Sequence, residues 1–234
     1  MVENVFRDIK VCVFDAYGTL FDFNSAAERC RDVLGDKADE LSALWRSKQL
    51  QYTWLRGMMG KHKPFREVTG DALDFTLKTL DVDDPALRNR LMDLYDHIQA
   101  FPEVPEVLRT LKKAGIATAI LSNGSPDMLD AAVQHTGIGD DLDAVLSVEA
   151  VGVYKPHPSV YELPTQHFGV SLPEISFQSS NAWDAVAAAT FGMRVVWCNR
   201  YGQQRECLTA QPDVEIKTLN ALPMILGLHG ANDS

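Results

Sequence analysis

Polar and charged side chains that could do chemistry follow four apolar segments of the chain. They are Asp15 after residues 10–14, Ser122 and Asn123 after residues 116–121, Lys155 after residues 144–148, and Ser179, Asn181 and Asp184 after residues 175–178. A carboxylate that is held rigidly at the end of a buried strand can act as a nucleophile when it is ionised. A nearby ammonium group keeps the pKa of such a carboxyl group low. Asp15 could therefore serve as a nucleophile with Lys155 as its cationic partner, or it could simply cap the turn after its strand.

The apolar segments alternate with segments that have a helical pattern. We expect helices over residues 104–114, 125–137, 160–168 and 182–191, and a further strand over residues 194–198. Alternating strands and helices with short connections are typical of a parallel sheet that has helices on both faces. In such sheets, ligands bind at the carboxyl ends of the strands. We therefore predict an α/β fold with a Rossmann-like core, in which the four loops meet at one edge of the sheet.

The region from about residue 25 to residue 100 is helical and poor in strand signals. Apolar residues recur at helical spacing between Leu41 and Met59, and again between Leu87 and Ile98. Asp84 and Pro85 are suited to the N-cap and first position of the later helix. We predict an all-helical cap of residues 22–99, inserted into a core that is made of residues 1–21 and 100–234.

The composition excludes some classes of function. The chain has 234 residues and a net charge of −10, which argues against nucleic-acid binding because that needs a basic surface. No apolar run is long enough to span a bilayer, and the N-terminus lacks the pattern of a signal peptide, so we expect no membrane partner. The four cysteines show no zinc-binding or redox spacing. We therefore expect a cytoplasmic protein in a reducing compartment.

Five motifs resemble those of the L-2-haloacid dehalogenases, within the haloacid dehalogenase superfamily. They are FDAYGTLFD at 14–22, LWRSKQLQYTWL at 44–55, LSNGS at 121–125, VYKP at 153–156 and SSNAWD at 179–184. The likeness extends from the first strand to about Arg205, and the last motif is the most specific. The resemblance implies an enzyme that acts on a small 2-halogenated carboxylic acid, needs no cofactor and no metal, and forms a homodimer.

The resemblance also implies catalytic roles. Asp15 attacks C2 of an (S)-2-haloacid and expels halide, which leaves an ester on the enzyme. Water then attacks the carbonyl carbon of Asp15 and releases the (R)-2-hydroxyacid. Thr19 and Lys155 orient and stabilise Asp15. Asp184, with Ser179 and Asn181, positions and activates the water.

The expected substrate-binding residues come from both the core and the cap. The substrate carboxylate is expected against the backbone N–H groups of Ala16 and Tyr17 and against Ser122. Arg46 and Asn123 stabilise the departing halide. The expected apolar walls, which exclude competing water, are Leu50, Trp54, Phe65 and Trp183. Ser47 replaces a glutamine that is frequent in the family, and this leaves the size of the substrate open.

Two other functions are compatible with the same fold. The superfamily's phosphatases use a second aspartate two residues after the nucleophile and a carboxylate-rich fourth loop that holds Mg²⁺. Here the first position is Tyr17 and the fourth loop retains only Asp184. Magnesium prefers several oxygen ligands, so these replacements argue against a metal-dependent phosphatase. The other alternative is a non-catalytic binding module.

Overall fold

The computed structural model describes residues 6–23 and 30–228. Over these residues, six parallel strands form one sheet in the order β3-β2-β1-β4-β5-β6. The strands are β1 (Val11–Phe14), β2 (Ala117–Ser122), β3 (Ala144–Ser147), β4 (Ile175–Ser179), β5 (Arg194–Cys198) and β6 (Val214–Ile216). Strand β1 lies between β2 and β4, and all its residues are buried. Burial on both faces explains why its sequence is continuously apolar instead of alternating.

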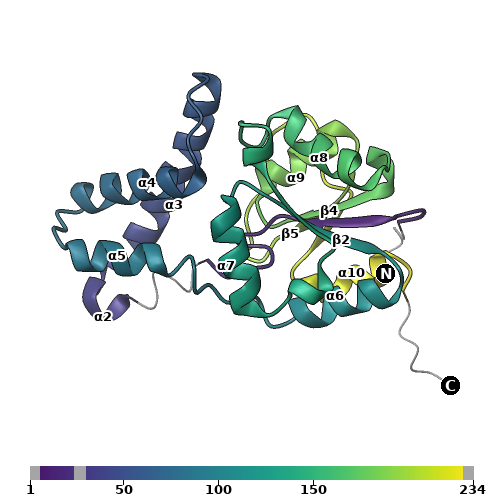
Figure 1. Cartoon of the computed structure of the whole chain (residues 1–234), viewed down its shortest axis with the longest axis horizontal. Helices are drawn as coiled ribbons and strands as arrows, with labels where there is room; N and C mark the ends of the chain where they lie inside the picture. Colours follow the sequence, from purple (N-terminus) through teal and green to yellow (C-terminus); the bar gives the residue numbers. More distant parts are fainter. Residues whose placement is uncertain (1–5, 24–29, 229–234) are drawn as a thin grey trace.

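Helices cover both faces of the sheet, as predicted (Figure 1). They are α6 (Val104–Lys113), α7 (Pro126–Thr136), α8 (Pro158–Phe168), α9 (Ala182–Phe191) and α10 (Leu222–Ile225), with short 3-10 turns at Gly139–Asp141, Val148–Ala150, Leu172–Glu174 and Leu219–Ala221. In Figure 1, α8 and α9 lie above the sheet, and α6, α7 and α10 lie below it. The α/β fold with a Rossmann-like core is confirmed.

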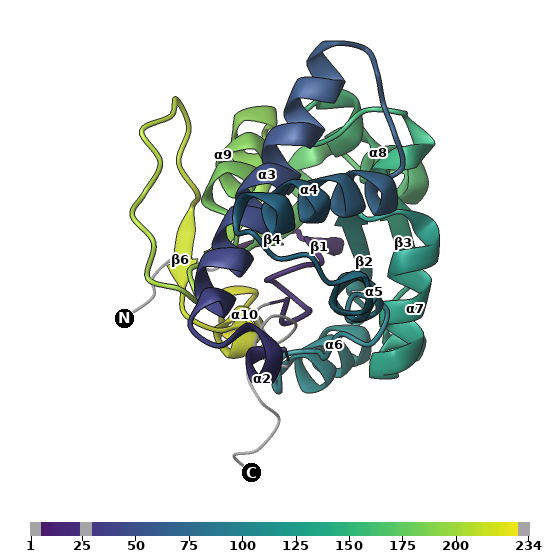
Figure 2. The ribbon, with the colours of Figure 1, turned by 90° about the vertical axis from the view of Figure 1, so that its left-hand side faces the viewer.

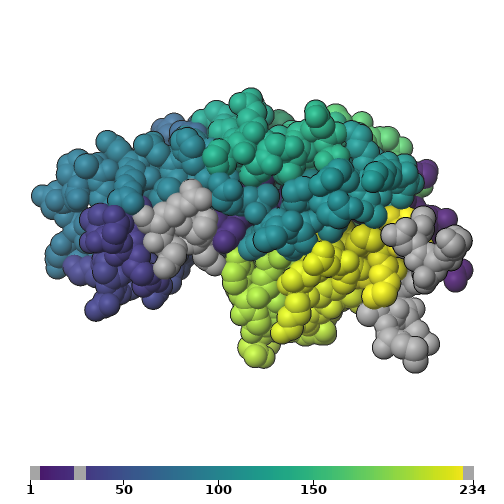
Figure 3. Space-filling view, turned by 90° about the horizontal axis from the view of Figure 1, so that it is seen from below, coloured from purple at the N-terminus to yellow at the C-terminus, as the bar shows by residue number. Residues whose placement is uncertain are grey.

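The sequence analysis predicts no element beyond β5, whereas the structure adds β6 and α10. Strand β6 is three residues long and extends the sheet at its edge, where Val196 pairs with Val214. Helix α10 has four residues and packs against α6. Figure 3 shows the two segments side by side on the lower face of the molecule. Segments this short contain little more than one period of a helix or strand pattern, so periodicity could not find them.

The remaining helices form a cap at one end of the molecule. They are α2 (Arg31–Leu34), α3 (Lys37–Met58), α4 (Phe65–Thr79) and α5 (Pro85–Asp93). Helix α5 begins as predicted, because Asp84 accepts hydrogen bonds from the backbone N–H groups of Ala86 and Leu87, each at 2.9 Å. Figure 2 shows α3 and α4 in front of the sheet when the molecule is viewed from the cap side.

The outgoing and returning chains lie side by side where the cap joins the core. Phe21 and Ala100 form an antiparallel bridge, and the backbone N–H of Asp22 donates to the carbonyl oxygen of Gln99 at 2.8 Å. We propose this pairing as the boundary of a cap of residues 22–99. None of the helices in residues 6–23 and 30–228 has the length and apolar character needed to cross a membrane.

Candidate active site

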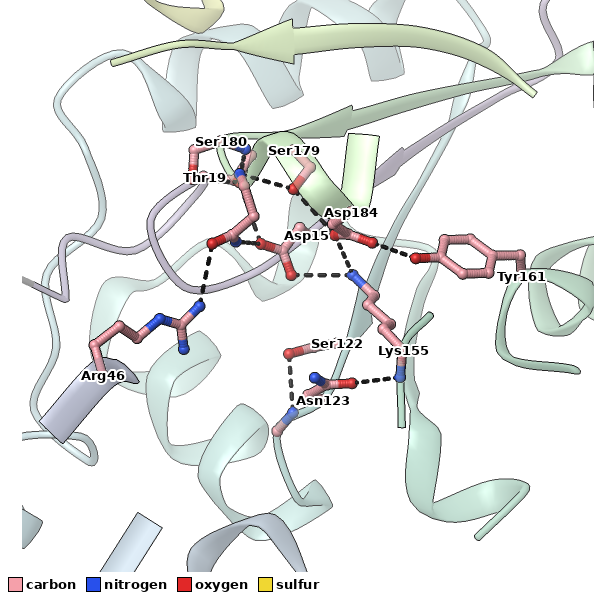
Figure 4. A network of polar contacts seen from close by, with 12 residues as sticks. Asp15, Thr19, Arg46, Ser122, Asn123, Lys155, Tyr161, Ser179, Ser180 and Asp184 are labelled. Carbon is pink, nitrogen blue, oxygen red and sulfur yellow. Dashed lines mark hydrogen bonds and ion pairs between the residues drawn. The ribbon is translucent and has the colours of Figure 1, made fainter. Parts of the chain in front are cut away.

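Asp15 lies at the carboxyl end of the central strand and is the geometric centre of the polar cluster (Figure 4). Its backbone N–H donates to the carbonyl oxygen of Gln178 at 2.9 Å, which continues the β1–β4 pairing up to Asp15 itself. The residue is only 7% exposed. A carboxylate on a paired central strand has little freedom to move, which is what a nucleophile with a fixed line of attack needs.

Three side chains hold the carboxylate of Asp15, one from its own turn and two from other loops of the core. The Lys155 ammonium lies 3.1 Å from Oδ1. Oδ2 accepts hydrogen bonds from Asn181 Nδ2 at 2.8 Å and from Thr19 Oγ1 at 3.4 Å. The structure therefore brings together four of the residues that the sequence predicts.

Lys155 is a buried cation that two carboxylates share. Its Nζ donates to Asp184 Oδ2 at 2.8 Å as well as to Asp15. Burial alone would lower the pKa of Lys155, but the charges of Asp15 and Asp184 outweigh burial and raise it. Lys155 therefore stays protonated and counters the charge of the nucleophile.

Asp184 accepts hydrogen bonds from three side chains. Besides Lys155, Ser179 Oγ donates to Oδ2 at 3.0 Å and the Tyr161 hydroxyl donates to Oδ1 at 2.6 Å. Burial raises the pKa of Asp184, and the Lys155 ammonium and these donors limit the rise. A carboxylate with a raised pKa is a stronger base than an exposed one, which suits a group that must activate water.

Tyr161 is a site residue that the sequence analysis missed. It lies on α8, where its ring packs against Phe177 and Phe191. An aromatic residue at a buried helical position is usually part of the core. No feature of the sequence distinguishes Tyr161 from such core residues. The hydrogen bond from its hydroxyl to Asp184 identifies it as a site residue (Figure 4).

The turn after β1 is tied to the loop after β4. Thr19 Oγ1 accepts from the backbone N–H of Ser180 at 2.8 Å and lies 3.3 Å from Ser180 Oγ. Gly18 is in the left-handed region with φ +89°, and a Cβ atom there would lie 2.8 Å from Ser180 Oγ. Both the backbone conformation and the close approach require glycine. Ser180, which the sequence analysis did not select, therefore supports Thr19.

Arg46 reaches the core from cap helix α3. It is half-buried, and its Nη2 donates to Asn181 Oδ1 at 3.3 Å. Because Asn181 Nδ2 also donates to Asp15, a single amide links the cap arginine to the nucleophile. Arg46 is therefore not an isolated surface group.

Ser122 and Asn123 follow β2 and organise the neighbouring loops. Asn123 Oδ1 accepts from the backbone N–H of Lys155 at 3.0 Å, and Ser122 Oγ accepts from the backbone N–H of Gly124 at 3.0 Å. Both residues are buried. The carbonyl of Ala16, on the opposite loop, accepts from the backbone N–H groups of Leu20 and Phe21 and so closes the turn after Asp15.

Aromatic side chains form the apolar part of the site. Tyr17 is buried and stacks on Phe65, with ring centroids 6.2 Å apart. Trp183 meets Trp54 of α3 edge to face at 5.4 Å. Leu50 is half-buried one turn beyond Arg46, and Ser47 is exposed. Beside these residues, a cleft of about 400 Å³ opens between cap and core, lined by Thr53, Trp54, Gly57 and Met58 of α3 and by residues 153–157.

The donor set around Asp15 differs from that of a magnesium site. Within the described part of the chain, no three His, Cys, Asp or Glu side chains come together as metal ligands. Tyr17 occupies the position where the superfamily's phosphatases have their second aspartate, and its ring packs among other aromatic rings. Burial raises the pKa of the Tyr17 hydroxyl, so this position carries a neutral phenol where Mg²⁺ would prefer a carboxylate oxygen.

Comparisons with known proteins identify the family of this chain. The family profile of the haloacid dehalogenase-like hydrolases matches residues 9–192. The (S)-2-haloacid dehalogenase of Pseudomonas sp. strain YL is 47% identical over 92% of this chain and 93% of its own length. The crystal structure of a dehalogenase superposes with a TM-score of 0.92 at 40% identity, covering 94% of this chain and 98% of that chain. The L-2-haloacid dehalogenase of Xanthobacter autotrophicus with chloropropionic acid covalently bound gives 0.87 at 35% identity, covering 94% and 98%.

The chain therefore belongs to the haloacid dehalogenase-like hydrolases and, within them, to the (S)-2-haloacid dehalogenases. This confirms the family that the five motifs indicate.

Proposed function

We propose that the protein hydrolyses (S)-2-haloacids to (R)-2-hydroxyacids and halide through an ester on Asp15. The observation that carries this proposal is the carboxylate of Asp15, which is buried at the end of β1 and faces the Lys155 ammonium at 3.1 Å. The ammonium holds the carboxylate in its nucleophilic form, and the amide of Asn181 fixes its second oxygen.

In the first step, a carboxylate oxygen of Asp15 forms a bond to C2 of the substrate from the side opposite the halogen. The carbon–halogen bond breaks and its electron pair leaves with the halide, so the configuration at C2 inverts. Negative charge grows on the leaving halogen, and a fixed cation stabilises it most where water is excluded. Arg46 supplies this cation, and the amide of Asn123 is the second group proposed to stabilise the halide.

In the second step, water attacks the carbonyl carbon of Asp15. Asp184 takes a proton from the water, and Ser179 and Asn181 position it. The bond from the carbonyl carbon to the ester oxygen on C2 then breaks, and that oxygen, which came from Asp15, takes the second proton of the water and leaves as the hydroxyl of the product. Asp184 releases its proton to solvent. Asp15 is regenerated with one oxygen atom from water.

The substrate carboxylate lies against the backbone N–H groups of Ala16 and Tyr17 and against Ser122. Leu50, Phe65 and Trp183 surround the substituent on C2. Phe65 is 1% exposed, so water has little access to this side of the site. Exclusion of water strengthens the electrostatic interaction of Arg46 with the halide. The cleft between α3 and residues 153–157 is the route of entry.

The phosphatase and the binding module make different predictions, which one assay separates. The protein is incubated with L- and D-2-chloropropionate, with and without EDTA, and free chloride is measured. We expect release from the L form alone, unaffected by EDTA. EDTA-sensitive hydrolysis of p-nitrophenyl phosphate without chloride release would favour the phosphatase. Absence of both activities would favour the binding module.

The nucleophile is tested with Asp15→Asn, and Asp83→Asn in an exposed cap loop is the matched control. We expect the first variant to lose chloride release and the second to retain it. In a single turnover in H₂¹⁸O, the label should enter the peptide that contains Asp15. Label found in the hydroxyacid alone would indicate direct attack by water and contradict the ester.

We further propose that the protein acts as a homodimer in the cytoplasm. The end of α3 exposes large apolar side chains, with Met58 78% and Met59 63% exposed, and Leu55 lies beside them. Such a patch is suited to a second copy of the chain. The four cysteines are free, as in reducing compartments. Light scattering should give twice the chain mass, and Met58→Glu should shift it towards one chain.

A further inference from the structure

Gln49 is a fully buried amide in the interior of the cap, one turn beyond Arg46 on α3. Its Nε2 donates to Thr69 Oγ1 at 2.7 Å and to the Tyr95 hydroxyl at 3.2 Å. Its Oε1 accepts a hydrogen bond from Arg46 Nη1 at 2.7 Å. All three polar contacts of the amide thus lie inside the cap, and one of them ends on the arginine that faces the active site.

The partners of Gln49 allow only one orientation of the amide. A guanidinium group is a donor only, so a flipped amide would place its N–H groups against the N–H groups of Arg46. Thr69 is itself held in place, because its carbonyl accepts from Trp45 Nε1 at 2.9 Å. The amide oxygen of Gln49 is therefore fixed toward Arg46 and limits the movement of a long side chain with high rotamer entropy.

The contacts of Arg46 leave its charge uncompensated. Within residues 6–23 and 30–228, its polar partners are the amides of Gln49 and Asn181, and its guanidinium carbon lies 5.4 Å from the ring centroid of Phe23. None of these groups is a carboxylate. By contrast, Arg66 and Arg88 of the same cap pair with aspartates. A neutral partner orients Arg46 without weakening the field that it exerts on a neighbouring anion.

We infer that Gln49 is a positioning residue that aims Arg46 at the leaving halide and, being neutral, sets how strongly the rate depends on the halogen. The inference rests on the proposed function, in which Arg46 stabilises the halide. Charge attraction falls with distance, so a small halide gains more from a fixed cation than a large one. A change at Gln49 should therefore affect chlorinated substrates more than brominated ones.

The decisive variant is Gln49→Glu, which has nearly the same shape and places a carboxylate against Arg46. We expect kcat for L-2-chloropropionate to fall about tenfold. This is a smaller decrease than the one that follows removal of a whole transition-state donor. The ratio of kcat for the bromo substrate to kcat for the chloro substrate should rise about threefold or more, since the counter-charge weakens the smaller halide's interaction most. Inhibition by added chloride should also weaken.

Two further variants control this experiment. Gln51→Glu adds the same charge to the same helix, but Gln51 is exposed and accepts its hydrogen bond from Lys48. It should leave the ratio unchanged. Thr69→Val removes one acceptor of the Gln49 amide without adding charge. It should also lower kcat, but by less than Gln49→Glu does. If circular dichroism shows that Gln49→Glu does not fold, Thr69→Val becomes the deciding variant.

The outcomes separate the inference from the proposed function. If the wild type releases no halide, the proposed function fails. If the wild type is active but the halogen ratio stays constant in Gln49→Glu, the inference fails even when kcat declines, because a uniform decline indicates a structural role only. If that variant is unfolded and Thr69→Val leaves the halogen ratio at the wild-type value, the inference fails as well.

Discussion

At the scale of single residues, the site depends on one cation that two carboxylates share. Lys155 contacts Asp15 and Asp184 at 3.1 and 2.8 Å, so neither carboxylate can change its charge without affecting the other. This sharing suits a two-step reaction. When Asp15 becomes a neutral ester, the ammonium is left with Asp184 as its carboxylate partner.

The hydroxyl of Tyr161 should determine where activity begins on the pH scale. Its hydrogen bond lowers the pKa of Asp184, opposing the burial that raises it. In Tyr161→Phe that pKa therefore rises further, and Asp184 becomes ionised only at higher pH. We expect the acidic limb of the kcat–pH profile to move to higher pH. An unchanged limb would show that another group controls it.

Gly18 allows a second prediction at this scale. Gly18→Ala meets both a positive φ and the hydroxyl of Ser180 at 2.8 Å, whereas Gly202→Ala meets a positive φ of 63° with nothing within 4 Å. We expect Gly18→Ala to cost about 1–3 kcal/mol of strain and to lower kcat, because the turn carries Thr19. Urea unfolding and chloride release measure the two effects. Equal effects at both glycines would contradict the close contact as the cause.

The two kinds of site residue differ in how far the sequence could predict them. Asp15 and Lys155 follow strands, and the geometry of a parallel sheet brings such residues to one edge whatever the details of packing. Tyr161 and Gln49 lie on helices, and their role depends on which way a buried side chain points. Helical periodicity predicts that a position is buried, but not which polar group it meets.

At the scale of elements, the sheet positions the site, and the connections at its opposite edge hold the strands in register. Lys10, just before β1, forms an ion pair with Glu174 at 2.6 Å, and Glu174 also accepts from the backbone N–H and hydroxyl of Ser171. The backbone N–H of Lys10 donates to the carbonyl of Glu174. This corner joins the starts of β1 and β4, the two strands that end at Asp15 and Ser179.

The corner should contribute stability that depends on pH. The Lys10 ammonium and the Ser171 donors lower the pKa of Glu174 from 4.5 to about 2. A lowered pKa contributes stability above pH 4.5, and the contribution is lost as the pH falls toward about 2. The difference in urea midpoint between wild type and Glu174→Gln should therefore shrink between pH 6 and pH 2. A difference that grows on acidification would contradict this assignment.

At the scale of the whole molecule, catalysis requires the cap to stay closed on the core. Polar contacts across the boundary include the pair of Arg66 with Asp127 of α7 at 2.6 Å, the backbone N–H of Phe65 on Glu149 at 3.2 Å, and Arg46 on Asn181. The first pair is partly exposed, so it contributes little alone. The junction where the chain crosses between the two parts also joins them.

Arg200 and Glu103 form the buried ion pair at that junction. Arg200 Nη1 lies 2.6 Å from Glu103 Oε1, its Nη2 donates to the carbonyl of Thr19 at 2.8 Å, and its guanidinium carbon lies 3.8 Å from the ring centroid of Phe101. It thus joins the nucleophile's turn to the returning chain. Both side chains of the pair are less than 10% exposed.

Removing one member of this pair should therefore cost far more than removing one member of a surface pair. We expect Glu103→Ala to lower the free energy of unfolding by about 3–5 kcal/mol, because an uncompensated charge remains buried. Glu106→Ala, which breaks the exposed pair with Arg109, should cost at most about 1 kcal/mol. Urea unfolding at neutral pH measures both. The double variant Glu103→Leu with Arg200→Met should recover stability but not activity, since no group then holds the Thr19 carbonyl. Recovery of both would mean that the pair stabilises the junction without positioning the catalytic turn.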